Sequence, residues 1–369
     1  MSVYIHHIAT RLPQFAYPQA YTRELMKERV GDQRETKAIL HRIYSQSGIE
    51  QRYSVLPDFV EGTTDGFLFM KNGVFNPEPS TGSRNAVYTQ EARKMFSAVA
   101  RDVIEQSGLG VSDITHVITV SCTGFYAPGP DYTVVMDLGL ALNTPRIHVG
   151  FMGCYAAFPA LRMAKSFCEA DPNARVLVIS VELCSLHLQF SYQVDAMLGA
   201  SVFADGASAA IVSAHEPSNS PALRIDQLQT MLAPEGEADM AWTIGDNGFD
   251  MVLTSYVPKI LEMRAEETIQ PLLDASGISK EDIDIWAVHP GGRAIIDKVR
   301  DGMSLDESKL EYSRKVLSEV GNLSSATILF VLKSILDANL SNDQSLVAMA
   351  FGPGLTIESA VMKRVETKT

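Results

Sequence analysis

Cysteine is scarce in this sequence, and its few occurrences follow no metal or redox pattern. The 369 residues include only Cys122, Cys154, Cys168 and Cys184, and no two of them form a CxxC pair. A chain this long with so few cysteines is not a disulfide-stabilised scaffold, so we expect four reduced thiols. The eight histidines are scattered, and the carboxylates do not cluster with ligand spacing. No metal site is therefore predicted.

Long apolar runs and an excess of positive charge are also missing. No stretch of about 18 uncharged apolar residues occurs, and the first residues lack a basic segment followed by a long apolar run, so we expect a cytoplasmic protein without a membrane-spanning segment. The chain carries 31 Lys and Arg against 44 Asp and Glu, a net charge of −13. This balance disfavours nucleic acid and anionic membranes as partners. An anionic ligand would require a local basic patch.

The composition is that of an ordinary globular protein, with 46% hydrophobic and 20% charged residues. Its most informative pattern is a weak internal duplication. Residues 106–120 (QSGLGVSDITHVITV) resemble residues 275–289 (ASGISKEDIDIWAVH), with Asp113 and Asp282 in register 169 residues apart. Each copy predicts a helix that ends at glycine, an aspartate turn and a buried strand.

The duplication extends to the flanking segments. Helical patterns precede the two copies, over 91–106 and 260–275, and two further apolar helices follow Gly153 and Gly321, which lie 168 residues apart. A chance similarity between two apolar helices is the alternative interpretation. The shared offset of two separate elements favours true duplication.

Alternating strands and helices predict an α/β protein with mainly parallel sheets. We expect strands over 174–182, 206–214, 345–351 and 355–365. The chain divides into two halves, residues 1–220 and 221–369, which enclose helices between their sheets. The segment 216–221 (EPSNSP) is the expected loop between the halves.

Cys154 follows Gly153 at the predicted start of an uncharged, apolar helix. The positive end of a helix dipole, or a neighbouring imidazole, can lower a thiol pKa from about 8.5 to between roughly 3.5 and 7.5, which would make this cysteine a ready nucleophile. The alternative is a small buried cysteine with a packing role. Cys168, near the end of that helix, is predicted to belong to the core.

His289 ends the predicted strand 283–288 and is followed by the sharp turn Pro290-Gly291-Gly292. Ligands of parallel sheets bind at the carboxyl ends of the strands, so this position favours a functional imidazole. The other seven histidines have no comparable context.

Asn322 occupies the place in the second half that Cys154 holds in the first. Its ordinary role there would be to cap a helix N-terminus. Placed opposite Cys154, its amide would instead donate to a developing oxyanion. Cys154, His289 and Asn322 would then provide the nucleophile, the imidazole and the polarising donor that acyl transfer requires.

The contexts of these three residues resemble those of thiolase-fold condensing enzymes, and among them the type III polyketide synthases, the chalcone synthase-like family that includes bacterial alkylpyrone and alkylresorcinol synthases. Four motifs in the same order carry the resemblance: GFMGCYAA at 150–157, VHPGGRAI at 288–295, GNLSSA at 321–326 and AFGPGL at 350–355. The resemblance extends from residue 1 to about 365. It implies a thiolase-like fold of two duplicated halves in αβαβα layers.

The resemblance also implies the reaction. Cys154 would accept an acyl group from a coenzyme A thioester, malonyl-CoA would lose CO2, and its enolate would attack the bound thioester. His289 and Asn322 would hold the malonyl thioester oxygen as negative charge develops. Coenzyme A thioesters serve as substrates in this family, and no other cofactor is implied.

Substrate selectivity is expected to depend on the cavity wall. In plant relatives two phenylalanines guard the cavity mouth, and the matching positions are Leu188 and either Phe249 or Met251. Leucine at 188 is smaller than the phenylalanine of plant relatives, and several other wall positions also have small side chains. These features favour fatty acyl starters and alkylpyrone or alkylresorcinol products. The alternative is that the small residues only pack the core. The substrate-binding positions implied are Cys122, Ala127, Cys184, Leu188, Phe249, Met251, Ser324, Gly352, Pro353 and Gly354, the last three as a scaffold behind the cavity.

For coenzyme A itself, the resemblance assigns Arg42, Gly292 and Ala294. Two neighbouring basic positions of relatives are Ile39 and Gln46 here, so phosphate anchoring is weakened unless Lys37 compensates. The family forms homodimers, and the segment 121–139 resembles the loop that crosses between subunits, with Ala127 at the position that reaches the partner's cavity.

The sequence leaves two alternatives open. One is an initiating ketoacyl synthase that uses acyl carrier protein. Such enzymes share the three residues but typically place QAN after the histidine, where this chain has Pro290-Gly291-Gly292. The other alternative is a non-catalytic thiolase-fold binding subunit, which the intact contexts of Cys154, His289 and Asn322 disfavour.

Overall fold

The computed structural model describes residues 1–30, 33–217, 220–254 and 256–366. The loop predicted over 216–221 includes residues 218–219, which lie outside this description. The first half contains β1 (Tyr4–Arg11), β2 (Phe15–Pro18), α1 (Gln19–Arg29), α2 (Arg34–Ser45), β3 (Gln51–Ser54), β4 (Met70–Lys71), β5 (Val74–Phe75), α3 (Thr81–Ser107), β6 (His116–Ser121), α4 (Pro130–Leu138), β7 (Arg146–Gly150), α5 (Ala157–Ala170), β8 (Arg175–Leu183), α6 (Val194–Val202) and β9 (Asp205–Ser213). The second half contains β10 (Ala222–Leu232), β11 (Met240–Gly245), β12 (Gly248–Leu253), α7 (Val257–Ser276), β13 (Ile285–Val288), α8 (Arg293–Met303), α9 (Glu311–Val320), α10 (Thr327–Leu336), β14 (Ser345–Gly352) and β15 (Thr356–Val365).

The same order of elements occurs in both halves. In the first, α3 leads to β6 and α5 leads to β8 and β9; in the second, α7 leads to β13 and α10 leads to β14 and β15. Both β6–β8 and β13–β14 pair in parallel, and both β8–β9 and β14–β15 pair antiparallel. Gly108 and Gly277 end α3 and α7 in the left-handed conformation, as the sequence pattern predicted. The fold is therefore a duplication.

The two sheet layers join into one hydrogen-bonded sheet of nine strands, in the order β13-β14-β15-β10-β1-β9-β8-β6-β7. The join is made by β1, which pairs with β9 along its length and with β10 at Tyr4 and Ile5. The prediction of separate sheets is wrong at this corner. The prediction of mainly parallel pairing is also wrong, because the chain turns directly back from β14 into β15 and β8 likewise pairs antiparallel with β9.

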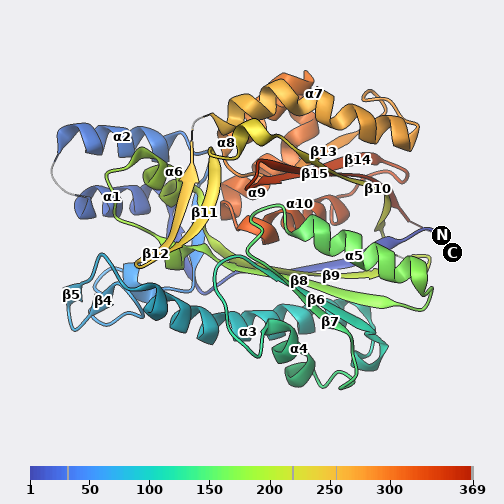
Figure 1. The fold of residues 1–369 in the computed structure, drawn as a ribbon, viewed down its shortest axis with the longest axis horizontal. Helices are drawn as coiled ribbons and strands as arrows, with labels where there is room; N and C mark the ends of the chain where they lie inside the picture. Colours follow the sequence, from blue (N-terminus) through green and yellow to red (C-terminus); the bar gives the residue numbers. More distant parts are fainter. Residues whose placement is uncertain (31–32, 218–219, 255, 367–369) are drawn as a thin grey trace.

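Helices fill the space between the layers and cover both outer faces (Figure 1). Helix α3 packs on β1, β8 and β9, whereas α7 packs on β10 and β15. Helices α5 and α10 lie between the layers, and α10 contacts strands of both halves. This burial explains why 327–332 are buried on every side of α10 and carry no charge. The predicted αβαβα arrangement is confirmed.

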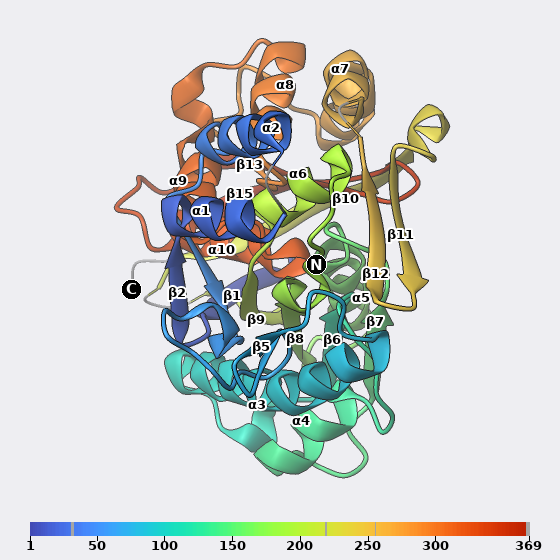
Figure 2. The ribbon, with the colours of Figure 1, turned by 90° about the vertical axis from the view of Figure 1, so that its left-hand side faces the viewer.

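Two parts of the chain lie outside the repeated units, the pair α1 and α2 and the hairpin of β11 and β12. Both lie beside the central helices. Helices α1 and α2 pack together and α2 contacts α6 (Figure 2). The hairpin of β11 and β12 extends from the α7 side toward α3, where the Thr81 main-chain N–H donates to the Asp246 carbonyl over 2.8 Å. These two parts form walls of the cavities described below.

The central position of α10 predicts a large cost for loss of packing there. Leu329 is 0% exposed, so Leu329→Ala is expected to lower the free energy of unfolding by about 2–5 kcal/mol in urea titration. Met263→Ala on α7, at a side chain 71% exposed, is the control and should change that free energy by less than about 0.5 kcal/mol. A cost for Leu329→Ala as small as that of the control would contradict the enclosed position of α10.

Candidate active site

A cavity of about 520 Å³ lies where the two halves meet. Cys122, Cys154 and Cys184 line it from the first half. His289, Asn322 and Ser324 line it from the second half. The structure therefore brings the three predicted catalytic residues to one enclosure, although they are distant in the sequence.

Cys154 lies in a tight turn between β7 and α5. Helix α5 begins only at Ala157, so the prediction that Cys154 opens the helix is wrong by three residues. Gly153 has a positive φ of 94°, and a Cβ on it would lie 2.6 Å from the Pro353 ring. Glycine is thus required at 153, both by the backbone and by the close packing of the 352–354 loop behind the turn.

The pKa of the Cys154 thiol also differs from the prediction. Burial raises this pKa to about 12, and the nearby Glu182 carboxylate adds to the rise, whereas hydrogen bonds from Ser324 and Asn322 oppose it. Desolvation therefore outweighs the stabilisation of a thiolate that the helix dipole alone would give. Within this cavity the resting group is a thiol, which needs a base to become a nucleophile.

His289 is the group placed to serve as that base. It directly follows β13, held by the hydrogen bond from its main-chain N–H to the Met349 carbonyl over 2.7 Å. The residue is 1% exposed, and neither ring nitrogen has a hydrogen-bond partner within the described residues. Burial lowers the pKa of this imidazole to about 3, so the ring is neutral and one nitrogen can accept a proton. Buried polar atoms without partners are rare, and His289 is one of the residues that line the cavity.

Asn322 connects the turn after His289 with the turn before α10 by hydrogen bonds. Its Nδ2 donates to the Gly291 carbonyl over 3.2 Å, and its Oδ1 accepts from the Ser324 main-chain N–H over 2.8 Å. The second bond resembles a helix cap, so the capping role expected of an asparagine is present in part. The amide is thereby fixed with its nitrogen toward the histidine loop. It is also close enough to hydrogen-bond Cys154.

Glu182 is a site residue that the sequence analysis missed. It lies in β8, is 0% exposed, and accepts hydrogen bonds from the Cys122 main-chain N–H and the Thr123 hydroxyl, each over 2.9 Å, and from Ser325. Burial raises its pKa to about 7. A lone carboxylate inside the apolar run RVLVISVEL was the signal that would have identified it.

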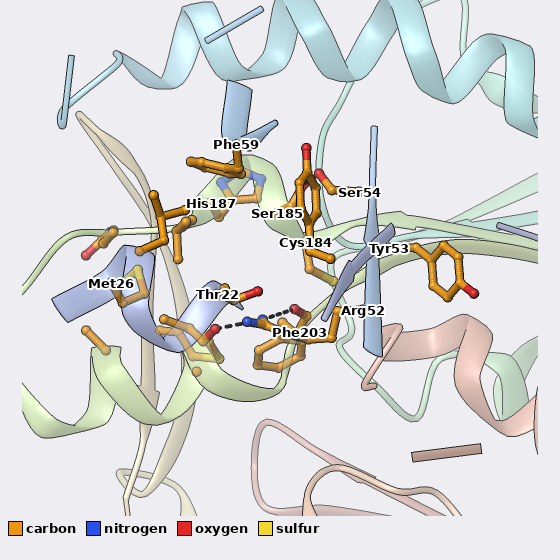
Figure 3. Close-up of a pocket in the computed structure, with 18 of the residues that line it drawn as sticks. Thr22, Met26, Arg52, Tyr53, Ser54, Phe59, Cys184, Ser185, His187 and Phe203 are labelled. Atoms are coloured by element: carbon orange, nitrogen blue, oxygen red, sulfur yellow. Dashed lines mark hydrogen bonds between the residues drawn. The ribbon is translucent and has the colours of Figure 1, made fainter. Parts of the chain in front are cut away.

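A smaller cavity of about 90 Å³ adjoins the first (Figure 3). Leu188 and Phe249 line only this smaller cavity, whereas Cys184, Phe203, Trp242 and Met251 line both. Arg52 lies at its edge, bonded to the carbonyl oxygens of Ala200 and Phe203. The four shared residues therefore form the wall between the two spaces.

Trp242 and His187 hold that wall in place. The Trp242 indole N–H donates to the Cys122 carbonyl over 3.2 Å. His187 donates from Nε2 to the Thr123 carbonyl over 2.8 Å and accepts the Phe249 main-chain N–H at Nδ1 over 3.1 Å. Burial lowers the pKa of His187 to about 3, which keeps this arrangement neutral. His187 has no distinctive sequence context, because its partners are main-chain groups of distant segments.

Other predicted wall residues lie elsewhere. Pro353 lines the large cavity, but Gly352 and Gly354 do not; a Cβ on Gly352 would lie 2.4 Å from the Tyr155 ring, so this glycine supports the turn from behind. Ala127 is exposed in the loop before α4 and lines neither cavity of its own chain. Gly352 and Gly354 thus lie outside the lining of the large cavity, and the roles of the 352–354 loop as a scaffold and of Ala127 toward a partner's cavity stay predictions.

Arg42, Gly292 and Ala294, assigned to coenzyme A by resemblance, all line the large cavity. Lys37 does not line it. In the part of the chain that the structure describes, His, Cys, Asp and Glu form no group of three or more able to hold a metal ion. None of the described helices has the length and apolar character needed to cross a membrane.

Comparison with known proteins gives consistent matches. Residues 4–217 match the model of the N-terminal domain of chalcone and stilbene synthases, and residues 225–366 match that of the C-terminal domain. A crystal structure of PKS-I from the brown alga Ectocarpus siliculosus is 29% identical, with a TM-score of 0.91 and 99% of each chain covered.

Two further solved structures are similar over the whole chain. The C-terminal type III polyketide synthase domain of Steely1, a type I/III hybrid from Dictyostelium, is 25% identical with a TM-score of 0.91. The 1,3,6,8-tetrahydroxynaphthalene synthase of Streptomyces coelicolor A3(2), a bacterial type III polyketide synthase, is 27% identical with a TM-score of 0.88. In both cases 99% of this chain and 100% of the other chain are covered.

The position of Cys154 and His289 on one cavity predicts a proton transfer that glutamine cannot support. In His289→Gln the side chain keeps polar atoms but loses the basic nitrogen, so alkylation of Cys154 by iodoacetamide at pH 7 is expected to slow by about 10²-fold or more. Peptide mass spectrometry would follow the modification of Cys154, with its rate in the unaltered protein as reference. An unchanged rate in a variant that unfolds at the same temperature would show that the imidazole does not activate this thiol.

Proposed function

The chain belongs to the chalcone and stilbene synthase family and is a type III polyketide synthase, and from that premise we propose that Cys154, His289 and Asn322 condense malonyl-CoA with a fatty acyl-CoA starter. Family membership favours a polyketide synthase over the two alternatives that the sequence left open, a priming ketoacyl synthase and a non-catalytic subunit. The single observation that carries the proposal is the buried, unbonded imidazole of His289 on the same cavity as Cys154.

The first step loads the starter. The Cys154 thiol gives its proton to the neutral His289 imidazole as sulfur attacks the acyl-CoA carbonyl carbon. The carbon–sulfur bond to coenzyme A breaks, and the departing thiolate takes the proton back from His289. The enzyme then holds the acyl group as a thioester, and its imidazole is neutral again.

The second step extends the chain. Malonyl-CoA loses CO2, and the electron pair of the broken carbon–carbon bond forms an enolate. A donor from His289 and the Asn322 Nδ2 would stabilise the enolate oxygen. The enolate carbon attacks the Cys154 thioester, releases the thiolate and forms a β-ketoacyl-CoA, which returns to Cys154 for further rounds and then cyclises.

The two adjoining cavities support a fatty acyl starter and an alkylpyrone or alkylresorcinol product. The large cavity has the room for a growing polyketide next to Cys154, and the smaller one continues past Cys184 between α1, α6 and β12. Its lining is mainly apolar and includes Leu188, Phe249 and Met26. An alkyl chain gains free energy from such a surface in proportion to the area buried.

The face that carries Ala127 supports a homodimer with acyl-CoA and malonyl-CoA as its small-molecule partners. Strand β7 is an edge strand of the nine-stranded sheet. Several large apolar side chains around it are exposed in the single chain: Phe125, Tyr132, Met136, Leu142 and Ile147. A second copy that pairs along this edge would cover both the open strand and the apolar surface.

The roles of the second-half residues predict a selective effect at Asn322. Asn322→Ala is expected to retain loading of a radiolabelled acyl group onto Cys154 while malonyl-CoA decarboxylation falls by about 10²–10³-fold. Asn322→Asp is the sharper variant. It keeps an oxygen to accept from Ser324, but loses the amide donor, so it should show the same selective loss. Equal loss of loading and decarboxylation in both variants would contradict this division of roles.

The proposed path for the starter predicts an effect of side-chain size at Cys184. Cys184→Phe would fill the wall shared by the cavities, so turnover of starters with eight or more carbons is expected to fall about tenfold or more relative to short starters. Cys184→Ser is the control of similar size and should keep the native order of preference. Product mass spectrometry over a starter panel tests this. If aromatic or malonyl starters outcompete the long chains in the native enzyme, the fatty acyl assignment fails.

A further inference from the structure

Several cationic side chains line the large cavity of this strongly acidic protein. The ionised side chains that line the large cavity are four cations and one carboxylate: Arg42, Lys259, Arg293, Lys298 and Asp297. The whole chain has a net charge of −13. On so acidic a protein an anionic ligand requires a local basic patch, and this group is such a patch.

Three of these cations are not neutralised by close ion pairs. Arg42 is exposed and has no ion pair among the residues described. The Lys259 ammonium lies 5.2 Å from the centre of the Tyr256 ring, a contact that leaves its charge in place. Lys298 differs, because its ammonium is 3.0 Å from a Glu262 carboxylate oxygen.

Arg293 is the cation best placed to bind an additional anion. Its Nε lies 3.5 Å from Asp297 Oδ2, whereas Arg314 holds the same carboxylate more closely, over 2.7 Å. The Arg293 side chain is 57% exposed, so this weak pair is screened by water. Most of the Arg293 charge and its guanidinium donors remain available.

The cations lie on different elements around the mouth of the cavity. Arg42 belongs to α2, and Arg293 is the first residue of α8, directly after the Gly291-Gly292 turn. The loop after α2 touches the start of α8, since a Cβ on Gly48 would lie 3.3 Å from the Arg293 Cβ (Figure 2 shows α2 and α8 in the same region). Lys259 approaches from the first turns of α7.

Coenzyme A has a charge distribution that matches this arrangement. Its pantetheine arm is uncharged and would enter the cavity toward Cys154, whereas its 3′-phosphate and diphosphate remain at the far end of the molecule. We propose that Arg293, with Arg42 and Lys259, binds these phosphates. The proposal rests on the proposed function, because that function requires coenzyme A thioesters.

The arrangement of these cations also explains how the chain compensates for the small number of basic side chains that α2 contributes to the cavity. Ile39 is partly buried against the cluster of Met26, Val30 and Leu40, and Gln46 lines the cavity without charge. Only Arg42 therefore supplies charge to the cavity mouth from α2. Arg293 on α8 and Lys259 on α7 supply further positive charge to this cavity, and an arginine can bind a phosphate with two parallel N–H donors.

Charge reversal at Arg293 tests the proposal directly. Arg293→Glu is expected to weaken binding of free coenzyme A by about tenfold or more in isothermal titration, because a charge-assisted hydrogen bond is lost and repulsion is added. In turnover, KM for malonyl-CoA should rise with kcat nearly unchanged. The kcat/KM for malonyl-N-acetylcysteamine, which lacks the nucleotide, should not change.

Arg300→Glu is the matched control. It lies on the same helix, introduces the same change in charge and does not line the cavity. Coenzyme A affinity that is unchanged in Arg293→Glu, or reduced equally in Arg300→Glu, would overturn the proposal. If Arg293→Glu lowers turnover with malonyl-acyl carrier protein but not with malonyl-CoA, the proposal is overturned in favour of a surface that docks a carrier protein. If the native protein condenses no thioester while coenzyme A binding still depends on Arg293, the proposed function fails and the phosphate site stands.

Discussion

A thiol and an imidazole that share one buried cavity are the constraint on which the rest of this structure depends. Burial favours the uncharged form of each group, since it raises the pKa of Cys154 and lowers that of His289. Transfer of one proton creates both charges together, and their attraction in a poorly polar cavity offsets much of the cost of forming them. The arrangement therefore requires a rigid junction between the halves. Gly153, Gly352 and Pro353 provide it, because their close packing admits no larger side chain at the two glycines.

Most of the fold could be predicted from the sequence because its signals are local. Apolar periodicity and the glycines that end α3 and α7 identified the repeated helix–strand units. The layered arrangement followed from the resemblance. The join between β1 and β10 and the antiparallel return strands could not be predicted, because strand partners and directions depend on contacts between distant segments. The division at residue 220 stays a prediction.

The candidate site shows the same contrast between residues with a local sequence signal and residues that depend on contacts with distant segments. Cys154, His289 and Asn322 were identified because each lies beside a turn at the end of a strand or helix, and the structure places all three on one cavity. Glu182 and His187 were missed since their partners are mainly main-chain groups and hydroxyls of other segments, which no motif records. The thiol pKa was predicted in the wrong direction because the local dipole was considered without the desolvation that the second half imposes.

The position of β1 has a consequence for how the protein is made. Strand β1 is synthesised before both of its neighbours, β9 and β10, so its main-chain groups near Tyr4 have no second partner until residue 224 has been synthesised. Until then the amino-terminal half exposes part of its sheet edge and the apolar faces that later cover α10. Such surfaces favour association between nascent chains, and retention of the first half by chaperones would protect it during translation.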